Sequence, residues 1–358
     1  MLKVTIGGSD FTEVLTGAPQ IQDQLNATCR TLQFSVEQIR NPQRLVGYQA
    51  ELFYKGVRWF VGDIKTHGID GTGNTTFKVC DPCFFFGKNP DDYYFKKQTA
   101  TQIVTTLAGK CKVKVASIAN TGAVFPYLYY PGSSSTPDKI IIDTLARTKS
   151  ANGKKFWFRY DPIKDGLILF ERSIPPNLWA LQSGVNLTNA SKTESIEELC
   201  STVKLVNRET GKVVVKTNAD AQAQYGATQH FEEVNNDVTD INRKATELLE
   251  SLSKVAVTMS VSAVNPKGVM GQFYSGDAIY VEEPNTGMAG GYYIRNITQT
   301  FHAKDLITID ADLDRTQELP VIQFSDADKE DDEKKSSNSG QGNGGSVTLP
   351  ITGVEIGT

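Results

Sequence analysis

The stretches WFVGDI at residues 59–64 and YYIRNI at residues 292–297 decide how this chain folds. Each begins with two aromatic residues and one aliphatic residue. Two residues that are glycine, polar or charged follow, and the stretch ends in isoleucine. After a turn, each is followed by a run that alternates between apolar and polar residues, at 75–80 and at 306–310. Such alternation is typical of strands. The shared order favours divergent copies of one β unit, although a run of six residues also recurs by chance.

The first stretch belongs to a β-rich region that spans residues 1–96. Short aromatic and β-branched runs recur there, each bounded by glycine, asparagine or proline, at residues 32–36, 48–54, 59–66 and 75–80. Lys55 and Gly56 between two of these runs predict a tight hairpin. Short strands with closely spaced turns favour a barrel or a sandwich.

The next region, residues 97–180, changes to an α+β pattern. The sequence TATQ at 99–102 is a capping box, which predicts a helix that ends near Gly109. Pro137 lies in the first turn of a second predicted helix. Two apolar runs within residues 156–170 flank a polar turn and predict a hairpin. We therefore expect a small α+β domain here.

An aromatic segment between these two helices is unusual for a loop. It contains Phe125, Tyr127, Tyr129 and Tyr130, with prolines and a glycine around them. One interpretation is that these side chains fill the join between two domains. The other is a partner-binding surface between subunits, where tyrosine and phenylalanine are enriched.

Residues 181–320 are again mostly β, and one helix interrupts the strands. Within residues 236–255 apolar side chains recur every three or four positions, with charged side chains on the other side. Such a stripe indicates an amphipathic helix that packs on another element. We therefore expect a second β domain with this helix inserted.

The charge of the chain is concentrated at its end. Among 358 residues, 37 lysines and arginines against 41 acidic residues give a formal charge of −4. Residues 326–358 hold seven acids and three lysines, which accounts for the whole −4. A balanced remainder argues against capture of nucleic acid or an anionic membrane as the main function. No apolar run reaches the roughly 18 residues of a membrane span, and the start lacks a signal-peptide block, which predicts a protein without Sec export.

The last region, residues 321–358, begins as an acidic linker rich in serine, glycine and asparagine and ends in an apolar tip. We expect the tip to bind a partner, for instance by adding a strand to a sheet. The alternative is a frayed end. The candidate partner-binding residues of the tip are Val347, Leu349, Ile351, Val354 and Ile356.

Patterns typical of catalysis or metal binding are weak. The three histidines are isolated, and neither a GxSxG motif nor a local Cys–His arrangement is present. Cys80 and Cys83 form a CxxC, but no second pair of ligands completes a zinc site, which favours buried thiols. The acidic run at 310–314 has Arg315 where a calcium loop needs glycine, which favours a strand with water-facing aspartates. We expect no cofactor, metal or catalytic residue, although a carboxylate pair formed in three dimensions stays open.

The order of these elements resembles that of the baseplate hub proteins of contractile phage tails and tail-like bacteriocins. The resemblance is to the PBSX-like hub family in particular and, more distantly, to the T4-type hub. It covers about residues 1–318 and carries no catalytic motif. It implies a mainly β fold with two related tube-like β-barrels, over residues 1–96 and 181–320, separated by the α+β domain of residues 97–180.

The resemblance also implies a structural role in a virion tail baseplate assembled in the cytoplasm of a bacterial host. Two similar barrels per chain would let a homotrimer form a six-fold-like ring between the tail tube protein and the three-fold central spike protein. The tape-measure protein and baseplate wedge proteins are further implied partners. An infectious phage and a headless particle both fit. The alternatives are a tail protein that binds or hydrolyses cell-wall peptidoglycan or polysaccharide, and a bare carbohydrate-binding module.

Overall fold

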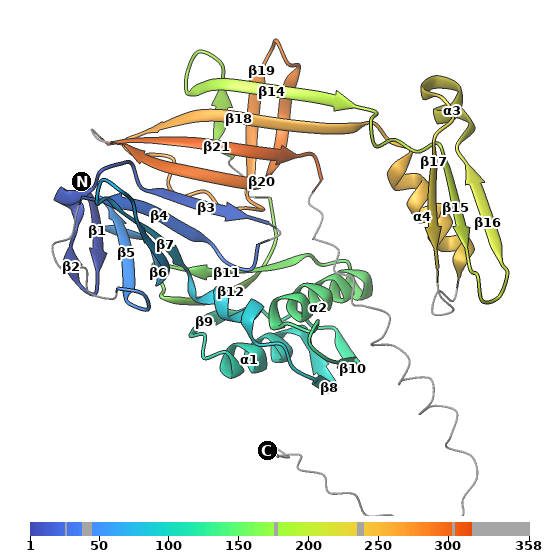
Figure 1. The fold of residues 1–358 in the computed structure, drawn as a ribbon, viewed down its shortest axis with the longest axis horizontal. Helices are drawn as coiled ribbons and strands as arrows, with labels where there is room; N and C mark the ends of the chain where they lie inside the picture. The colour runs from blue at the N-terminus through green and yellow to red at the C-terminus, as the bar shows by residue number, and fades with distance from the viewer. Residues whose placement is uncertain (26, 38–44, 175–177, 235–239, 303–304, 317–358) are drawn as a thin grey trace, which may run out of the picture.

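The computed structural model of the chain describes residues 1–25, 27–37, 45–174, 178–234, 240–302 and 305–316. Its centre is a 13-stranded sheet, and the two β-rich regions share it (Figure 1). Along the main path the order is β14 (Leu187–Ser195), β18 (Ala256–Pro266), β21 (Leu306–Asp314), β20 (Met288–His302), β3 (Gln20–Gln24), β4 (Thr31–Val36), β7 (Thr75–Cys80), β6 (Val57–Ile69), β5 (Gln49–Tyr54), β1 (Leu2–Ile6) and β2 (Ser9–Asp10). Off this path, β19 (Ala278–Glu283) pairs with β20, and β13 (Ala180–Gln182) pairs with β19.

The seam between the two β regions is the antiparallel pair β3–β20, in which Gln24 pairs with Asn296 and Gln20 with Thr300. Strand β3 was not predicted, because its sequence QIQDQ contains a single apolar residue. The described strands show no closed barrel, whereas the sequence predicted two. Instead, β3 of the first region pairs with β20 of the second, so that the two regions form one sheet.

Each half of the large sheet has a hydrophobic core of its own. The first core includes Phe60 and Phe77 and also takes Phe301 from β20. The second is built around residues such as Val281 and Ile294. The similar stretches at residues 59–64 and 292–297 lie on β6 and β20, and each of these strands pairs with the strand before it and the strand after it. The duplication itself stays a prediction.

The strand β6 approaches β7 so closely at Gly62 that a larger residue does not fit. A Cβ at this position would lie 2.2 Å from the carbonyl oxygen of Cys80. At the start of β6, Lys55 and Gly56 have φ angles of 51° and 79°. Positive φ at both residues is what a two-residue hairpin loop of type I′ requires. The predicted hairpin is confirmed, since Tyr54 pairs with Val57.

The middle region combines helices with two small sheets. Its elements are η2 (Pro82–Lys88), β8 (Tyr93–Thr99), α1 (Ala100–Lys110), β9 (Val115–Ile118), β10 (Val124–Tyr130), α2 (Pro137–Asn152), β11 (Phe156–Asp161) and β12 (Gly166–Glu171). Strands β11, β12 and β9 form one sheet, and β10 and β8 form the other. The helices α1 and α2 pack against each other and bury a common core. A further short helix, η1 (Thr12–Val14), follows β2.

The helix ends of the middle region confirm one prediction and correct another. The capping box is present, because the side chains of Thr99 and Gln102 each accept from the other's backbone N–H. Gly109 is not the C-cap, because α1 continues to Lys110 and Cys111 occupies the capping position. By contrast, α2 ends at Gly153, whose φ of 77° is the left-handed conformation that favours glycine.

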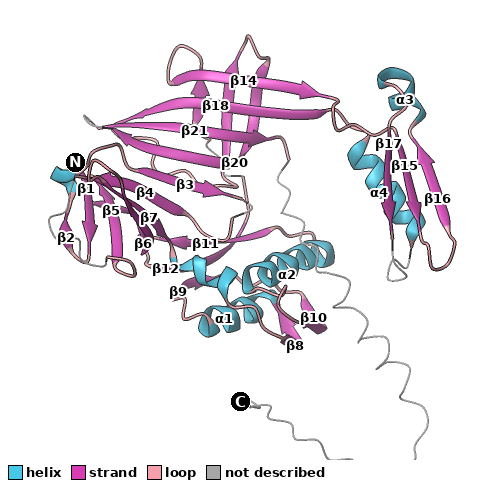
Figure 2. Cartoon of the chain, viewed as in Figure 1, coloured by secondary structure: helices cyan, strands magenta, loops and turns pink. Residues whose placement is uncertain are grey.

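Residues 196–255 leave the large sheet after β14 and return to it at β18, and we call this segment the arm. Its elements are β15 (Thr202–Val206), β16 (Val213–Thr217), α3 (Ala219–Tyr225), β17 (Gln229–Glu233) and α4 (Ile241–Leu252). The predicted amphipathic helix is α4, and it buries Ile241 and Ala245 against the sheet of β16, β15 and β17 rather than against the large sheet. Figures 1 and 2 show that the arm extends beyond the end of the large sheet.

Candidate functional site

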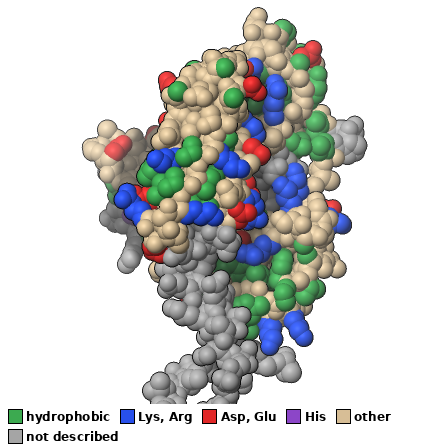
Figure 3. All heavy atoms as spheres, turned by 90° about the vertical axis from the view of Figure 1, so that its right-hand side faces the viewer, with side chains coloured by type: hydrophobic (Ala, Val, Ile, Leu, Met, Phe, Trp, Pro, Cys, Tyr) green, Lys and Arg blue, Asp and Glu red, His purple; other side chains and the backbone are tan. Residues whose placement is uncertain are grey.

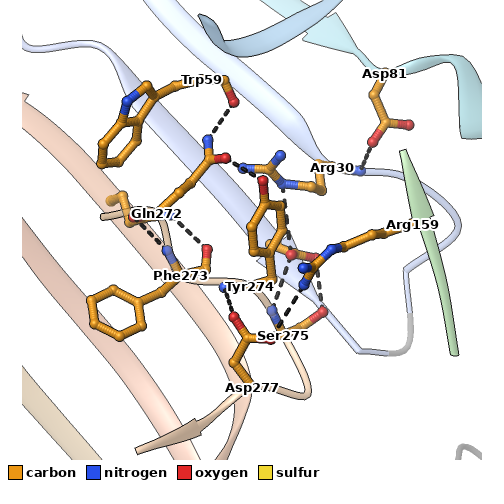
Figure 4. Close-up of polar contacts among 11 residues, drawn as sticks. Arg30, Trp59, Asp81, Arg159, Gln272, Phe273, Tyr274, Ser275 and Asp277 are labelled. Atoms are coloured by element: carbon orange, nitrogen blue, oxygen red, sulfur yellow. Dashed lines mark hydrogen bonds and ion pairs between the residues drawn. The ribbon is translucent and has the colours of Figure 1, made fainter. Parts of the chain in front are cut away.

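Three parts of the molecule meet at a buried cluster of polar side chains, which we call the junction (Figure 4). Asp23 comes from β3 and Arg30 from the connection between β3 and β4. Asp81 follows β7, Arg159 lies on β11, and the loop 272–277 precedes β19. The junction therefore joins the first β region, the middle region and the second β region.

Asp23 binds the loop before β19 to the first β region. Its carboxylate accepts hydrogen bonds from the backbone N–H of Ser275 at 3.0 Å and from the Ser275 hydroxyl at 2.9 Å. The Nε of Arg30 lies 3.6 Å from Asp23 Oδ2. Both side chains are buried, so solvent screens this ion pair little, and removing one partner would leave the other charge uncompensated.

The ring of Tyr274 lies against two guanidinium groups. The Cζ atom of Arg159 is 3.7 Å from the ring centroid, and that of Arg30 is 4.5 Å from it. The Tyr274 hydroxyl donates to the side-chain oxygen of Gln272, whose amide donates to the carbonyl oxygen of Trp59. Cation–π contacts gain strength when they are removed from water. Tyr274 therefore fastens β11, β6 and the β3–β4 connection to one loop.

Asp277 completes the attachment of the middle region. Its Oδ1 lies 3.2 Å from Arg159 Nη1, and its Oδ2 accepts from the backbone N–H of Tyr274 at 3.0 Å. Burial raises the pKa of Asp277, while Arg159 acts in the opposite direction. In addition, Arg172 Nη2 donates to the carbonyl oxygen of Gly276 at 3.1 Å. Two arginines from the middle region thus hold the same loop.

Asp81 makes the junction sensitive to pH. Its carboxylate accepts from the backbone N–H of Arg30 at 3.1 Å and from that of Cys83 at 2.9 Å. Burial raises the pKa of Asp81 to about 7, against the lowering effects of the Arg30 N–H and of the Arg30 charge. The junction therefore contains a carboxyl group that titrates near neutral pH.

A second contact between the middle region and the large sheet is centred on Arg58 of β6. Its Nη1 lies 2.8 Å from Glu51 Oε1, and its Nη2 lies 3.1 Å from Asp165 Oδ1. Its Nε donates to the carbonyl oxygen of Pro162 at 2.6 Å. Because Pro162 and Asp165 belong to the turn between β11 and β12, this arginine fixes the far end of that hairpin. Together with the junction, it fixes the orientation of the middle region on the sheet.

The CxxC cysteines are buried, as the sequence favoured. Cys80 ends β7 and Cys83 lies in η2. Burial raises the pKa of Cys83. The thiol that contacts Cys80 is that of Cys29, whose hydrogen bond lowers the pKa of Cys80 to about 7, an arrangement the sequence did not indicate. In the part of the chain that the structure describes, no group of three or more His, Cys, Asp or Glu side chains could hold a metal ion.

The aromatic segment is a strand rather than a loop, which corrects the sequence analysis. Residues 124–130 form β10, which pairs with β8. Phe125 and Tyr130 are buried in the core of the middle region, and the Tyr130 hydroxyl donates to Asp143 Oδ2. Tyr127 is exposed and contacts the ring of Tyr94, and Tyr129 is half-buried. Prolines suggested a loop, but a two-stranded sheet has open edges on which proline is tolerated.

Two further segments that the sequence singled out are the acidic run at 310–314 and the apolar tip. The run at 310–314 lies on β21 with Asp310 and Asp312 exposed and with Ala311 and Leu313 buried, which confirms the predicted strand. The tip residues Val347, Leu349, Ile351, Val354 and Ile356 lie outside the described residues. None of the helices described is long and apolar enough to cross a membrane.

The large sheet ends in a long edge at β14. Among the described strands, β14 pairs along its length with β18 alone, from Leu187 to Ser195. Beyond a single bridge between Leu187 and Ser183, its other side presents backbone N–H and C=O groups, which can accept a further strand from another chain. The opposite end of the path is the two-residue strand β2.

Comparison with known proteins places these features in a family. The profile of the YQBQ-like family matches residues 20–313. The phage-like element PBSX protein XkdQ of Bacillus subtilis (strain 168) is 27% identical over 260 residues, which are 72% of this chain and 78% of that protein. The solved 43 kDa tail protein of prophage MuSo2 from Shewanella oneidensis matches with a TM-score of 0.65 and 15% identity, covering 90% of this chain and 99% of that one.

A further solved structure with this fold is the E. coli c3393 protein. It is described as a component of the type VI secretion system with structural similarity to the T4 tail proteins gp27 and gp5. It matches with a TM-score of 0.54 and 12% identity, covering 89% of this chain and 79% of that one. The resemblance to the PBSX-like family is confirmed. Since the family profile extends from β3 to β21 and includes the middle region and the arm, the chain belongs to the YQBQ-like family.

Proposed function

We propose that this protein is the structural hub of a contractile tail baseplate. Three copies form a ring that joins the six-fold tail tube to the three-fold central spike. The observation that carries the proposal is the single large sheet with two separate cores, in a fold shared with a phage tail protein over nearly the whole length of both chains. Two similar halves per chain and three chains per ring provide six similar positions.

The sheet edges supply a mechanism for ring closure. In a closed ring, each chain uses two different surfaces, one toward each neighbour. The long β14 edge and the opposite end of the sheet at β1 and β2 are two such surfaces. Pairing between neighbours would cover backbone groups that are open in the single chain. The tube-like barrels expected from the sequence would then be completed between copies.

In this proposal the protein acts through surfaces and not as an enzyme. The spike, tail tube, tape-measure and baseplate wedge proteins are its partners, and the virion tail baseplate is its location. Within the aromatic segment, Tyr127 and Tyr129 are the candidates for partner contacts, because Phe125 and Tyr130 are buried in the core. The rigid attachment of the middle region at the junction would keep these surfaces in fixed relative positions.

Immunogold electron microscopy of tail particles purified from the producing bacterium tests the location. We expect label at the baseplate end of the tail. Label along the sheath, or its absence from intact particles, would contradict the proposal. Incubation of the purified protein with cell walls provides a second test, because release of muropeptides would contradict a purely structural role.

A further inference from the structure

The arm has one sheet face that no described element covers. Helix α4 packs on the other face of the sheet. On the uncovered face Val213, Val215 and Phe231 are 52%, 54% and 48% exposed, although Val214 between the two valines is buried. Val215 and Phe231 both pair with Lys204 of the central strand, so they lie in one row across the sheet. We call these side chains the open face.

The open face lies beside an open strand edge. Among the described strands, β16 pairs with β15 alone, so the backbone groups on its outer side have no strand partner. Figure 3 views the molecule from the side of the arm and shows hydrophobic side chains next to lysine and arginine side chains. Apolar side chains grouped on a surface mark sites of interaction, and an open edge can accept an additional strand.

The C-terminal region leaves the body at the root of the arm. The described chain ends at residue 316, shortly after β21. Leu313 of β21 pairs with Met259 of β18. The arm returns to the sheet at Ala256, three residues before Met259, where Ala256 pairs with Ser195. Figure 1 shows that β21 ends on the side of the sheet that faces the arm.

The linker is long compared with the strand on which the tip would dock. Val347 is 31 residues beyond residue 316. A flexible chain of that length spans about 30 Å on average. Val215 is two residues from the end of β16, which is about 7 Å of strand. A tethered tip is present at an effective concentration on the order of 1 mM, so even a contact with a Kd of about 0.1 mM would be largely formed.

The pattern of the tip suits an added strand. Val347, Leu349 and Ile351 alternate with a period of two, which places them on one face of an extended segment. Pro350 lacks a backbone N–H, but an added strand is an edge strand, where proline is tolerated when its nitrogen faces outward. An extended apolar segment therefore matches both features of the arm, the open face and the β16 edge.

We propose that the apolar tip, residues 347–356, docks on the arm of its own chain as an additional strand along β16, with Val347, Leu349 and Ile351 on the open face. The contact would cover Val213 and Val215 until the arm or the tip is required elsewhere. It does not depend on the hub function, because it concerns two parts of one chain.

Hydrogen exchange of the intact chain, followed by mass spectrometry, tests this contact. We expect the double variant Leu349→Asp/Ile351→Asp to exchange the amides of residues 213–217 at least about fivefold faster than the wild type, because docking protects that edge. The matched control is Thr348→Asp/Thr352→Asp, which adds the same charge on the alternate positions and should leave exchange unchanged. Equal exchange in the wild type and the double variant would overturn the proposal.

A dilution series identifies which chain supplies the tip. Docking within one chain predicts that protection of residues 213–217 is independent of protein concentration. Protection that disappears on dilution would show that a second copy supplies the tip and would overturn the same-chain assignment. The variant Val215→Lys provides an independent check, since it should abolish the protection while circular dichroism shows that the fold is retained.

Discussion

The junction and the arm differ in which kind of side chain is buried and which kind is exposed. At the junction, Asp23 and Arg30 form a buried ion pair, and Arg159 of β11 and Asp277 of the loop before β19 form a half-buried one. These pairs connect distant segments of the chain. On the arm, valine and phenylalanine side chains remain half exposed on a sheet face that nothing described covers. At the junction, polar side chains are therefore enclosed in the body, whereas on the open face of the arm apolar side chains are exposed to solvent.

This difference shows which part of the molecule is complete as a single chain. A buried ionic cluster fixes one orientation, because any displacement leaves a charge unpaired. An exposed apolar face gains free energy only when something covers it. The body therefore satisfies its charged groups within the single chain, while the arm presents apolar side chains that the described residues leave uncovered.

Gly62→Ala should cause the largest loss in the free energy of unfolding. Its Cβ would lie 2.2 Å from the Cys80 carbonyl oxygen and 3.0 Å from the Asp81 nitrogen, so it would push the end of β7 into the junction. We expect a loss of about 3 kcal/mol or more in the free energy of unfolding, measured by urea denaturation. Gly68→Ala, on the same strand with nothing within 4 Å of its added Cβ, is the matched control and should change little. Equal effects of both variants would refute the proposed close approach.

Arg30→Met should be the next most costly change. It leaves Asp23 buried without its cation and removes one of the guanidinium groups against Tyr274. Breaking a buried pair in this way costs about 3 to 5 kcal/mol. Arg208→Met, which removes an exposed ion pair with Glu233 on the arm, should leave the urea midpoint nearly unchanged. A similar midpoint shift for both variants would remove the contrast between body and arm.

The stability of the body should decrease as the pH rises from about 4 to about 7. Burial raises the pKa of Asp81 from 3.8 to about 7, so in this range the folded protein holds a proton that the unfolded chain has released. That contribution is fully present below about pH 4 and is lost as the pH passes the folded-state value. Urea denaturation at pH 5 and pH 8 measures it. Asp81→Asn should flatten this pH dependence, and an unchanged dependence would show that Asp81 is not its source.

The smallest effect on stability is expected on the open face. In the double variant Leu349→Asp/Ile351→Asp, whose tip should not dock, Val215→Thr should change the free energy of unfolding by less than about 0.5 kcal/mol, because the side chain is half exposed. Val214→Thr, one position away and buried under α4, should cost several times more. Comparable losses for the two valines in that background, measured by thermal denaturation, would mean that the open face is covered even without the tip.

Local signals predicted the parts of the fold that depend on neighbours in sequence. The capping box at Thr99 and the hairpin at Lys55 and Gly56 were correct, because each is decided within four residues. The strand β3 was missed because QIQDQ has one apolar residue, and with it the seam that joins the two halves. In the arm, strands and one helix were predicted, but nothing in the sequence indicated that these strands pair with one another and not with the large sheet.

The junction could not have been predicted from the sequence. Asp23, Arg30, Asp81, Arg159 and Asp277 are spread over more than 250 positions, and each is an ordinary surface residue type. Only the pairing of β3 with β20 and the docking of β11 bring them together. The same holds for Cys29 and Cys80, since the CxxC pattern directed attention to Cys83 instead.

The mass of the intact chain in solution tests the central claim most directly. Light scattering on a chromatographically resolved sample gives this mass over a range of concentrations. The proposed hub predicts a species with three times the 39.3 kDa of one chain. A mass that stays at one chain at every concentration, or that settles at two copies, would contradict the three-fold ring.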